Sequence, residues 1–423
     1  RLVIVSAGTV QVPNPRYDPA DPTSTKTIPR DYGFGALRGD GAVTLNGALL
    51  PIVSWSDGVV VARVPVGFAS GQLLVRKSSA FGGRTSKVGV YVTSAPAGAP
   101  LPKVVAPGQS IQAVIDDPNT HDGNLVLVAP GTYYEYVIMD KKIQLQGWGA
   151  PSTTINAAKI ATAGLKEWRR LLARKIDAQQ PATCPAPDPD TGKCAVVSGP
   201  NRTFDLLPGQ TLGINLSDNE PLLFGAEEGP GILVVAANPA APSPNAHVFD
   251  ATSPARIDGL TITGADAGGG ILASGYARFL QIADNRVVSN YGTYGGGIRI
   301  GHTALLDAAN ALYGGYTDSG NSDVKILSNW ISQNGSTEAG AGGGVTLGNG
   351  STRYAVTGNY ICGNFSMADG GGVGHLGLSD RGVIANNTIV FNQTFNQSVN
   401  VTGGGVFVGG EPALAVGGAL SAG

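Results

Sequence analysis

The stretch that decides the fold runs from Ile326 to Asn334, reads ILSNWISQN, and is followed by GGGVTL from Gly342 to Leu347. The same phrase occurs four times: an apolar residue, an asparagine, a second asparagine, a glycine triplet and an apolar-x-apolar segment. The copies begin at Ile282, Ile326, Val356 and Ile384. The first asparagines are Asn285, Asn329, Asn359 and Asn387, and the second are Asn290, Asn334, Asn364 and Asn392. A short repeated unit cannot bury its apolar face alone, so the copies are expected to stack as rungs of a solenoid.

Each rung holds two short strand signals, such as Arg286–Val288 and Ile298–Ile300, which are too short for helices. Parallel strands of successive rungs lie about 4.8 Å apart, so equivalent asparagines should stack into two ladders whose amides bond along the stack. Asparagine and glycine between the strands are expected to supply positive φ, and the triplet a bend. A flexible Gly/Asn-rich linker is the alternative, but linkers do not keep apolar residues in register with asparagine.

A weaker rung, Ile257–Leu272, has a triplet at Gly268–Gly270 but Leu260 in place of the first asparagine. Further upstream, SIQAVI at 110–115 and LVLVAPGTY at 125–133 precede LQGWGA at 145–150. These segments resemble the opening of right-handed parallel β-helix proteins of the pectin-lyase-like superfamily, where a short amphipathic helix caps the first coil. The resemblance covers 105–157 and 250–423. It implies the fold but leaves the activity open, because that superfamily includes lyases, glycoside hydrolases, adhesins and structural surface proteins.

Residues 1–96 read as a different domain. Short strand signals with turn residues between them recur from Val43 to Val92, which favours an immunoglobulin-like β-sandwich. The set YGFG, VTLNG, IVSWSDGVVVARVP and SGQLLV resembles IPT/TIG-type domains, with a Pro- and Asp-rich insertion at 13–29. The chain is therefore expected to be all-β, with a sandwich at 1–96 and a right-handed parallel β-helix at 97–423. An insertion at about 158–247 should contain one amphipathic helix, which either packs on the coils with a solvated basic face or binds a partner.

The composition indicates the cellular compartment and excludes some classes of binding partner. Of 423 residues 63 are glycine and only 14% are charged, which suits β-helix coils and secreted proteins. A net charge of −2 gives no sign of a nucleic-acid partner, and no apolar run is long enough for a membrane span. Cys184 and Cys194 frame a short hydrophilic loop, so a disulfide in an oxidising compartment is expected, with free thiols as the alternative. Cys362 is expected to face the core.

The sequence identifies no catalytic residues. A lyase would need an arginine or lysine base with carboxylate-bound Ca²⁺, and a hydrolase a pair of carboxylates. No such pair recurs at matching places in adjacent rungs, and no residue matches a family active-site motif. Arg299, for example, has no carboxylate beside it in the neighbouring rungs. No metal or other cofactor is expected.

Three functions stay open: a secreted or cell-surface scaffold for adhesion, assembly or glycan contact; a polysaccharide lyase or hydrolase; and the carbohydrate-binding part of a larger enzyme. Exposed aromatic residues that could stack on sugars are the candidates for glycan contact, with core packing as the alternative: Tyr291, Tyr294, Tyr313 and Tyr316. The last rung carries no polar cap, so the polypeptide is expected to continue past Gly423, or to meet another subunit of a self-assembly there.

Overall fold

The computed structural model describes residues 1–14, 16–86, 90–94, 101–158, 162–176, 202–210, 229–305, 307, 316–337, 342–397 and 399–409. It divides into two compact units, Arg1–Ala99 and Pro100–Gly423. We call them unit 1 and unit 2.

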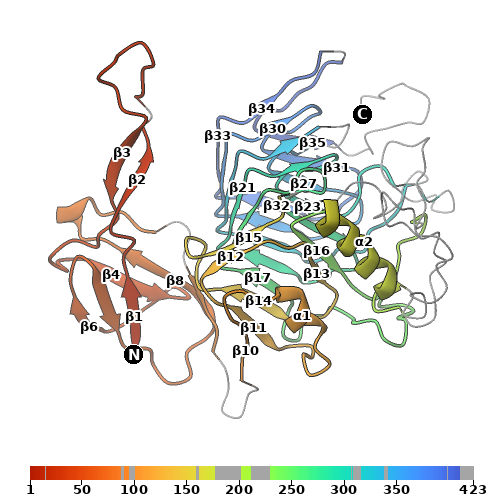
Figure 1. Cartoon of the computed structure of the whole chain (residues 1–423), viewed down its shortest axis with the longest axis horizontal. Coiled ribbons are helices and arrows are strands. Elements are labelled where there is room, and N and C mark those ends of the chain that lie inside the picture. The colour runs from red at the N-terminus through yellow and green to blue at the C-terminus, as the bar shows by residue number, and fades with distance from the viewer. Residues whose placement is uncertain are drawn as a thin grey trace. The chain divides into compact units, whose positions relative to one another are not determined.

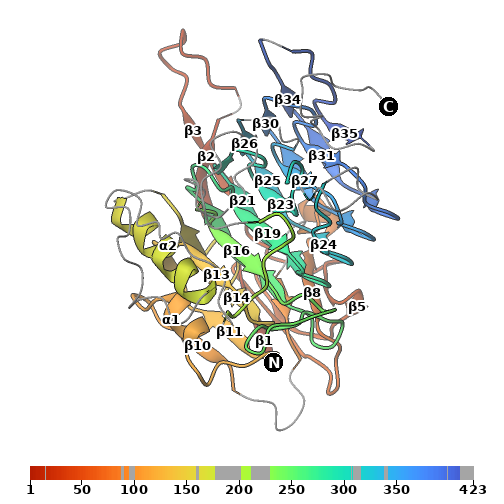
Figure 2. The ribbon, with the colours of Figure 1, turned by 90° about the vertical axis from the view of Figure 1, so that its right-hand side faces the viewer.

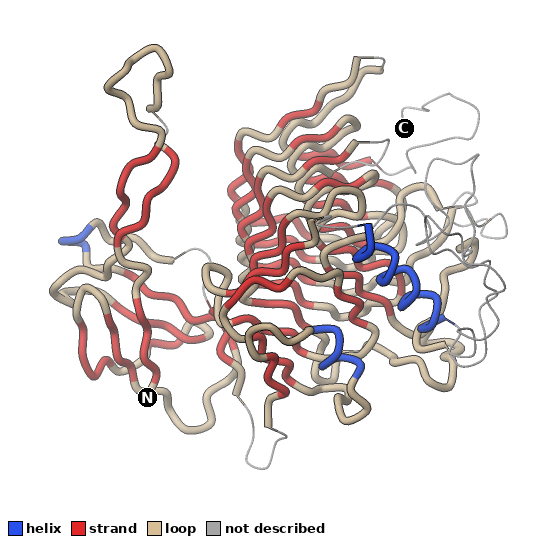
Figure 3. The backbone as a smooth tube through the Cα atoms, viewed as in Figure 1, coloured by secondary structure: helices blue, strands red, loops and turns tan. Residues whose placement is uncertain are grey.

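Unit 1 is a small β-sandwich of two antiparallel sheets. Val60 of one sheet and Val43 of the other are fully buried in a shared apolar cluster. A hairpin carries the Pro-rich insertion away from the sandwich (Figure 3). The first sheet contains β1 (Leu2–Val5), β6 (Ile52–Trp55) and β7 (Val59–Ala62); the second contains β4 (Ala42–Leu45), β5 (Ala48–Leu49), β8 (Gly71–Arg76) and β9 (Val90–Val92); the hairpin is β2 (Thr9–Pro13) with β3 (Thr27–Asp31), and a 3₁₀ helix spans Ser79–Phe81.

Unit 2 is a parallel β-helix, so the fold class expected from the repeat is confirmed (Figure 1). After the opening strand β10 of the first sheet, each rung contributes one strand to each of three long sheets, and the last four described rungs add a two-residue strand to a short sheet. Going along the coil, the first sheet is followed by the second, the short and the third.

The strands are as follows. The first sheet contains β10 (Lys103–Val105), β11 (Leu125–Val128), β14 (Gln144–Gly147), β17 (Arg256–Asp258), β20 (Gln281–Ala283), β24 (Lys325–Leu327), β28 (Ala355–Thr357) and β32 (Val383–Ala385). The second contains β12 (Gly131–Tyr133), β15 (Thr153–Asn156), β18 (Thr261–Thr263), β21 (Arg286–Val288), β25 (Trp330–Ser332), β29 (Tyr360–Cys362) and β33 (Thr388–Val390). The short sheet contains β22 (Tyr291–Gly292), β26 (Gly335–Ser336), β30 (Phe365–Ser366) and β34 (Gln393–Thr394). The third contains β13 (Val137–Met139), β16 (Ile232–Val235), β19 (Ile271–Gly275), β23 (Ile298–Ile300), β27 (Val345–Leu347), β31 (Val373–Leu376) and β35 (Val406–Gly409).

The core of unit 2 is a set of apolar columns that run through the rungs in register. In the first sheet, the apolar residue that begins each repeat pairs with its equivalent in the next rung, so that Ile282 pairs with Ile326 and Ile326 with Val356. These side chains are at most 1% exposed. Burial of such columns is the main favourable term for a fold in which each rung touches only its neighbours.

Two helices accompany the coils. Helix α1 (Ile111–Asp116) begins at Ser110, whose hydroxyl accepts from the Ala113 amide, and it buries Ile111 and Ile115 against the first rungs. Helix α2 (Thr162–Ile176) packs Trp168 and Leu172 on the outer face of the third sheet, beside β13 and β16 (Figure 2). Its basic side is not simply solvated: Lys175 is 8% exposed and lies 2.7 Å from carboxylate oxygens of both Asp116 and Asp140. This pairing joins α2 to α1 and to the coil.

Candidate functional site

The eight repeat asparagines lie in two stacks at the corners of the coil. The first stack stands between the first and second sheets, and the second between the second and short sheets. Asn329 shows the pattern: its Oδ1 accepts from the backbone N–H and the side-chain Nδ2 of Asn285, at 3.0 and 3.2 Å. Its Nδ2 donates to the Ile282 carbonyl at 2.8 Å and to Asn359 Oδ1 at 3.0 Å. The stacks therefore satisfy buried turn amides that no strand can pair.

The positive φ angles stand one residue before each asparagine, and not at the asparagine as the sequence analysis expected. These residues share a left-handed conformation with φ between 54° and 69°: Asp284, Ser328, Gly358 and Asn386 in one stack, and Ser289, Gln333, Gly363 and Phe391 in the other. Glycine at two of these places has no steric cost, whereas a bulky residue such as Phe391 is strained there.

The glycine triplets let the backbone of one rung lie directly against the backbone of the next. This demands glycine more strictly than the bend that the sequence analysis expected. A Cβ on the middle glycine Gly343 would stand 2.2 Å from the Phe365 carbonyl oxygen in the next rung. The same position in the rung before, Gly296, meets backbone atoms of Gly335 at 2.5 Å. In the last described rung, Gly404 is less crowded, because a Cβ added there would be 3.2 Å from the Asn392 carbonyl oxygen. The third sheet and the short sheet can therefore approach only where side chains are absent.

An outward-facing group of aromatic residues, which we call the aromatic strip, covers the second and short sheets. It consists of Tyr291, Trp330, Tyr360, Phe365, Phe391 and Phe395. Trp330 and Tyr360 are neighbours in register, with ring centroids 4.4 Å apart. Trp330 is 40% exposed, and its Nε1 donates to Ser332 Oγ at 2.9 Å, which fixes the indole. The ring of Tyr291 extends over Gly335, within 2.8 Å of the place a Cβ would occupy there.

The four tyrosines expected to contact glycan differ in their surroundings. Tyr291 is 51% exposed. Tyr294 is only 3% exposed, and its ring centroid lies 5.3 Å from the Arg299 guanidinium carbon. Tyr316 is 7% exposed, and Tyr313 lies outside the described residues. Stacking on a sugar needs an accessible ring, so Tyr294 and Tyr316 serve packing, and Trp330 joins Tyr291 as a residue suited to contact.

A buried polar cluster lies at the end of the third sheet. Arg299 Nη2 is 3.0 Å from His302 Nδ1, and His302 Nε2 is 3.0 Å from Ser274 Oγ. Because arginine only donates, Nδ1 accepts, so the hydrogen of the neutral imidazole is on Nε2. Of two groups near Nε2, Ser274 Oγ at 3.0 Å can accept this hydrogen and Gln210 Nε2 at 3.3 Å cannot. This is the reverse of the arrangement that activates a serine nucleophile. Burial and the neighbouring Arg299 hold the pKa of His302 well below its usual value, so the ring stays neutral. The cluster therefore fastens the strand end.

A second buried cluster joins Arg256, Asp258 and Asp284. Arg256 Nε is 2.8 Å from Asp258 Oδ2, and Arg256 Nη2 is 3.6 Å from Asp284 Oδ2. Asp258 is fully buried, and its Oδ1 has no hydrogen-bond partner among the described residues. Burial raises the pKa of Asp258 to about 7, with Asp284 adding to the rise and Arg256 opposing it. Two carboxyls so placed have the chemistry of an acid/base pair, but both are at most 1% exposed. The sequence search missed Asp258 because it lies in the weaker rung, outside the four clear copies.

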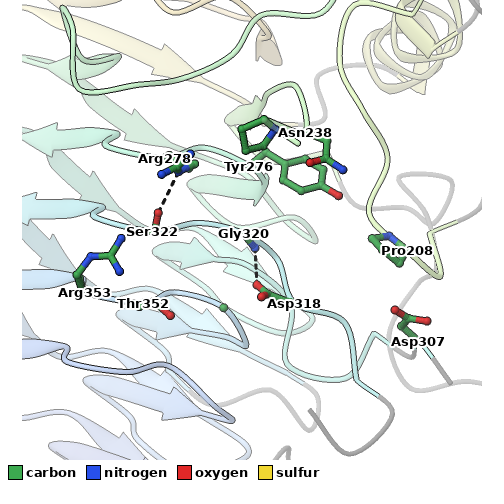
Figure 4. Close-up of a pocket in the computed structure, with 12 residues that line it drawn as sticks. Pro208, Asn238, Tyr276, Arg278, Asp307, Asp318, Gly320, Ser322, Thr352 and Arg353 are labelled. Carbon is green, nitrogen blue, oxygen red and sulfur yellow. Dashed lines mark hydrogen bonds between the residues drawn. The ribbon is translucent and has the colours of Figure 1, made fainter. Parts of the chain in front are cut away.

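An open groove of about 410 Å³ lies beside the turns that join the third sheet to the first (Figure 4). The turns contribute Tyr276, Arg278, Asp318 and Arg353, and the insertion contributes Pro208, Asn238 and Pro239. The sequence analysis did not find the residues that line this groove, because they lie in the insertion and in irregular turns outside the repeated phrase.

The cysteines do not support a functional assignment. Cys184 and Cys194, the expected disulfide partners, lie outside the described residues. Cys362 is a free thiol, half-buried on the face of β29 opposite to the buried Ile361, so its expected core position was wrong. Among the described residues, no three side chains of the histidine, cysteine, aspartate or glutamate types are grouped so as to hold a metal ion.

Comparison with known proteins gives one short similarity. A stretch of 47 residues is 47% identical to part of a cell surface glycoprotein of Methanothermus fervidus; it covers 11% of this chain and 8% of that protein. No protein-family profile matches the chain, and no solved structure matches it. In the described residues, no helix is both long and apolar enough to cross a membrane.

Proposed function

We propose that this protein is a secreted or cell-surface scaffold whose β-helix contacts a glycan through the aromatic strip. The observation that carries the proposal is the exposure of Tyr291, Trp330 and Phe391 at outward positions, at 51%, 40% and 85%. The coil needs only the inward apolar column and the asparagine and glycine positions, so nothing in the fold requires large aromatic side chains on the outside. Clustered exposed aromatic side chains mark contact surfaces, and flat rings suit the apolar faces of sugars.

The surroundings of the strip add to this support. Trp330 is held by Ser332 and lies against Tyr360, with the two ring planes tilted by 43°. In the preceding rung its register partner is Arg286, an exposed residue. An arginine beside a fixed ring can donate to sugar hydroxyls. The short similarity to a cell surface glycoprotein, together with the resemblance of the two units to IPT/TIG and pectin-lyase-like domains, favours an extracellular place.

The proposal is tested by screening the full chain on a glycan array and measuring affinities for the glycans it retains. We expect Trp330→Ala and Tyr291→Ala each to weaken binding about 3- to 10-fold, since an aromatic contact contributes ~0.5–1.5 kcal/mol. Trp148→Ala and Tyr134→Ala are matched controls, because these residues are 60% and 63% exposed but lie outside the strip. Unchanged affinity in both strip variants, or retention of no glycan, would refute the proposal.

A further inference from the structure

The groove in Figure 4 presents hydrogen-bond donors that the fold does not use. Arg278 donates from Nε to Ser322 Oγ at 3.2 Å, and within the described residues neither terminal nitrogen of its guanidinium has a recorded partner. The side chain is half-buried, with its guanidinium carbon 5.5 Å from the centroid of the Phe279 ring. A guanidinium restrained in this way is prepared to meet an oxyanion with two parallel N–H groups.

Tyr276 supplies a second donor. Its ring is 8% exposed and packs over Gly320, where an added Cβ would stand 2.8 Å from Tyr276 Cδ1. The hydroxyl has no recorded partner in the described part of the chain, although it lines the groove. Burial, with the carboxylates of Asp205 and Asp318 nearby, raises the pKa of Tyr276 to about 12, so the hydroxyl keeps its proton.

The turn that carries both residues is held in an uncommon conformation. Tyr276 and Phe279 have φ of 57° and 59°, which are left-handed angles that bulky residues rarely adopt. The next rung holds them there: the Tyr276 amide donates to the Ser319 carbonyl at 2.9 Å, and the Phe279 amide donates to the Ser322 carbonyl at 2.9 Å. The equivalents of Phe279 in the next three rungs, Asp323, Arg353 and Arg381, have the same left-handed φ, so the turn conformation recurs and holds Tyr276 and Arg278 in fixed places.

The charge along the groove is divided between its ends. Arg353 donates to both oxygens of Asp323, at 2.8 and 2.6 Å. Arg278 also helps to lower the pKa of Asp323, so two arginines share this one carboxylate. That end therefore carries a surplus of positive charge. Toward the other end stands Asp318, whose Oδ1 accepts from the Gly320 amide at 2.8 Å. A ligand that fits has an oxyanion at one point and hydroxyl donors farther along.

We infer that this groove binds an acidic saccharide, with a carboxylate or sulfate at Arg278 and ring hydroxyls toward Tyr276 and Asp318. The inference deepens the proposed glycan contact by adding a second, charge-selective site on turns apart from the aromatic strip. Binding here depends on charge–charge attraction and so weakens as salt rises, whereas ring stacking on the strip does not.

The experiment measures binding of the full chain to a tetragalacturonate, a sulfated chondroitin tetrasaccharide and neutral cellotetraose. The two acidic probes distinguish a carboxylate from a sulfate as the preferred group. We expect an acidic probe to bind more tightly than the neutral one. Arg278→Gln should weaken acidic binding about 10-fold or more and leave neutral binding unchanged. Tyr276→Phe, which keeps the ring, should weaken it about 3- to 10-fold.

Arg381→Gln is the matched control, because Arg381 is an exposed arginine in the corresponding turn three rungs on from Arg278 and does not line the groove. Trp330→Ala separates this inference from the proposed function: loss of neutral binding in that variant with acidic binding retained would support two sites. Equal affinity for acidic and neutral probes, or an Arg278→Gln variant that binds the acidic probes like the wild type while keeping its melting temperature, would overturn the inference.

Discussion

Replacing Asn329 by leucine removes one member from the middle of a stack while keeping the number of side-chain heavy atoms. The Asn285 backbone N–H, in a residue that is fully buried, loses its only recorded acceptor. An unpaired buried donor costs ~1–3 kcal/mol. The Ile282 carbonyl also loses the Nδ2 donor at 2.8 Å, which adds ~0.5–1.5 kcal/mol. The side-chain Nδ2 of Asn285 still donates to the Ile257 carbonyl at 2.9 Å, so it adds little to the loss of unfolding free energy. The unfolding free energy of unit 2 should therefore fall by ~2–4 kcal/mol.

The control for this change is Asn396→Leu. Asn396 lies near the surface, where its Nδ2 donates to the Met367 carbonyl at 2.9 Å and water can replace the bond, so a change within ~0.5 kcal/mol is expected. Urea unfolding of both variants, followed by far-ultraviolet circular dichroism, gives the difference. Hydrogen exchange of the Asn285 amide gives a local measure, and it should accelerate only in Asn329→Leu. If the two midpoints coincide and that amide stays protected, the stacks do not stabilise the coil in the way argued here.

Three further predictions concern stability and are checked by urea unfolding. Gly343→Ala should destabilise by ~1–3 kcal/mol, because its Cβ would meet backbone oxygen, whereas Gly404→Ala should be tolerated; equal losses would contradict this reading of the triplets. Phe391→Gly should stabilise by about 1 kcal/mol by relieving a left-handed φ of 56°, and a lower unfolding midpoint than that of the wild type would contradict this. Asp258 has a pKa of about 7 when folded against 3.8 unperturbed, so the folded state binds more protons and the unfolding free energy should fall as pH rises from about 4 to 7. Asp258→Asn should flatten that slope, and a slope that persists would show that another group causes it.

The repeat predicts the fold well because the coil imposes strict requirements at few positions. The inward column needs apolar residues, the corners need asparagine, and the contact between the third and short sheets needs glycine. These requirements recur together in the four repeat copies, so they are visible in the sequence as a period. The positive φ before each asparagine is not visible in this way, because aspartate, serine, glycine, glutamine and phenylalanine all occupy it.

The candidate site could be predicted only in part. Exposure of Tyr291 agrees with the expected contact role, but Tyr294 and Tyr316 are buried, and burial of a residue in a turn depends on which neighbouring rung covers it. The polar groove was not predictable, because Tyr276 and Arg278 come together with Asn238 only through the path of the insertion. Such residues follow no period, and their arrangement is decided by long-range packing.

Some positions of the coil are restricted by the fold and the outward positions are not, and this difference also bears on function. An outward residue of this coil can change without loss of the stacks or the columns, so the fold alone gives no reason for Trp330 to be 40% exposed directly beside Tyr360. A large exposed aromatic residue adds the risk of aggregation and contributes little to folding. We therefore expect part of the gain to come from contact with another molecule, as in the proposed glycan contact. The same reasoning applies to the strained turn at Tyr276, whose left-handed backbone reduces stability but holds a hydroxyl at the groove.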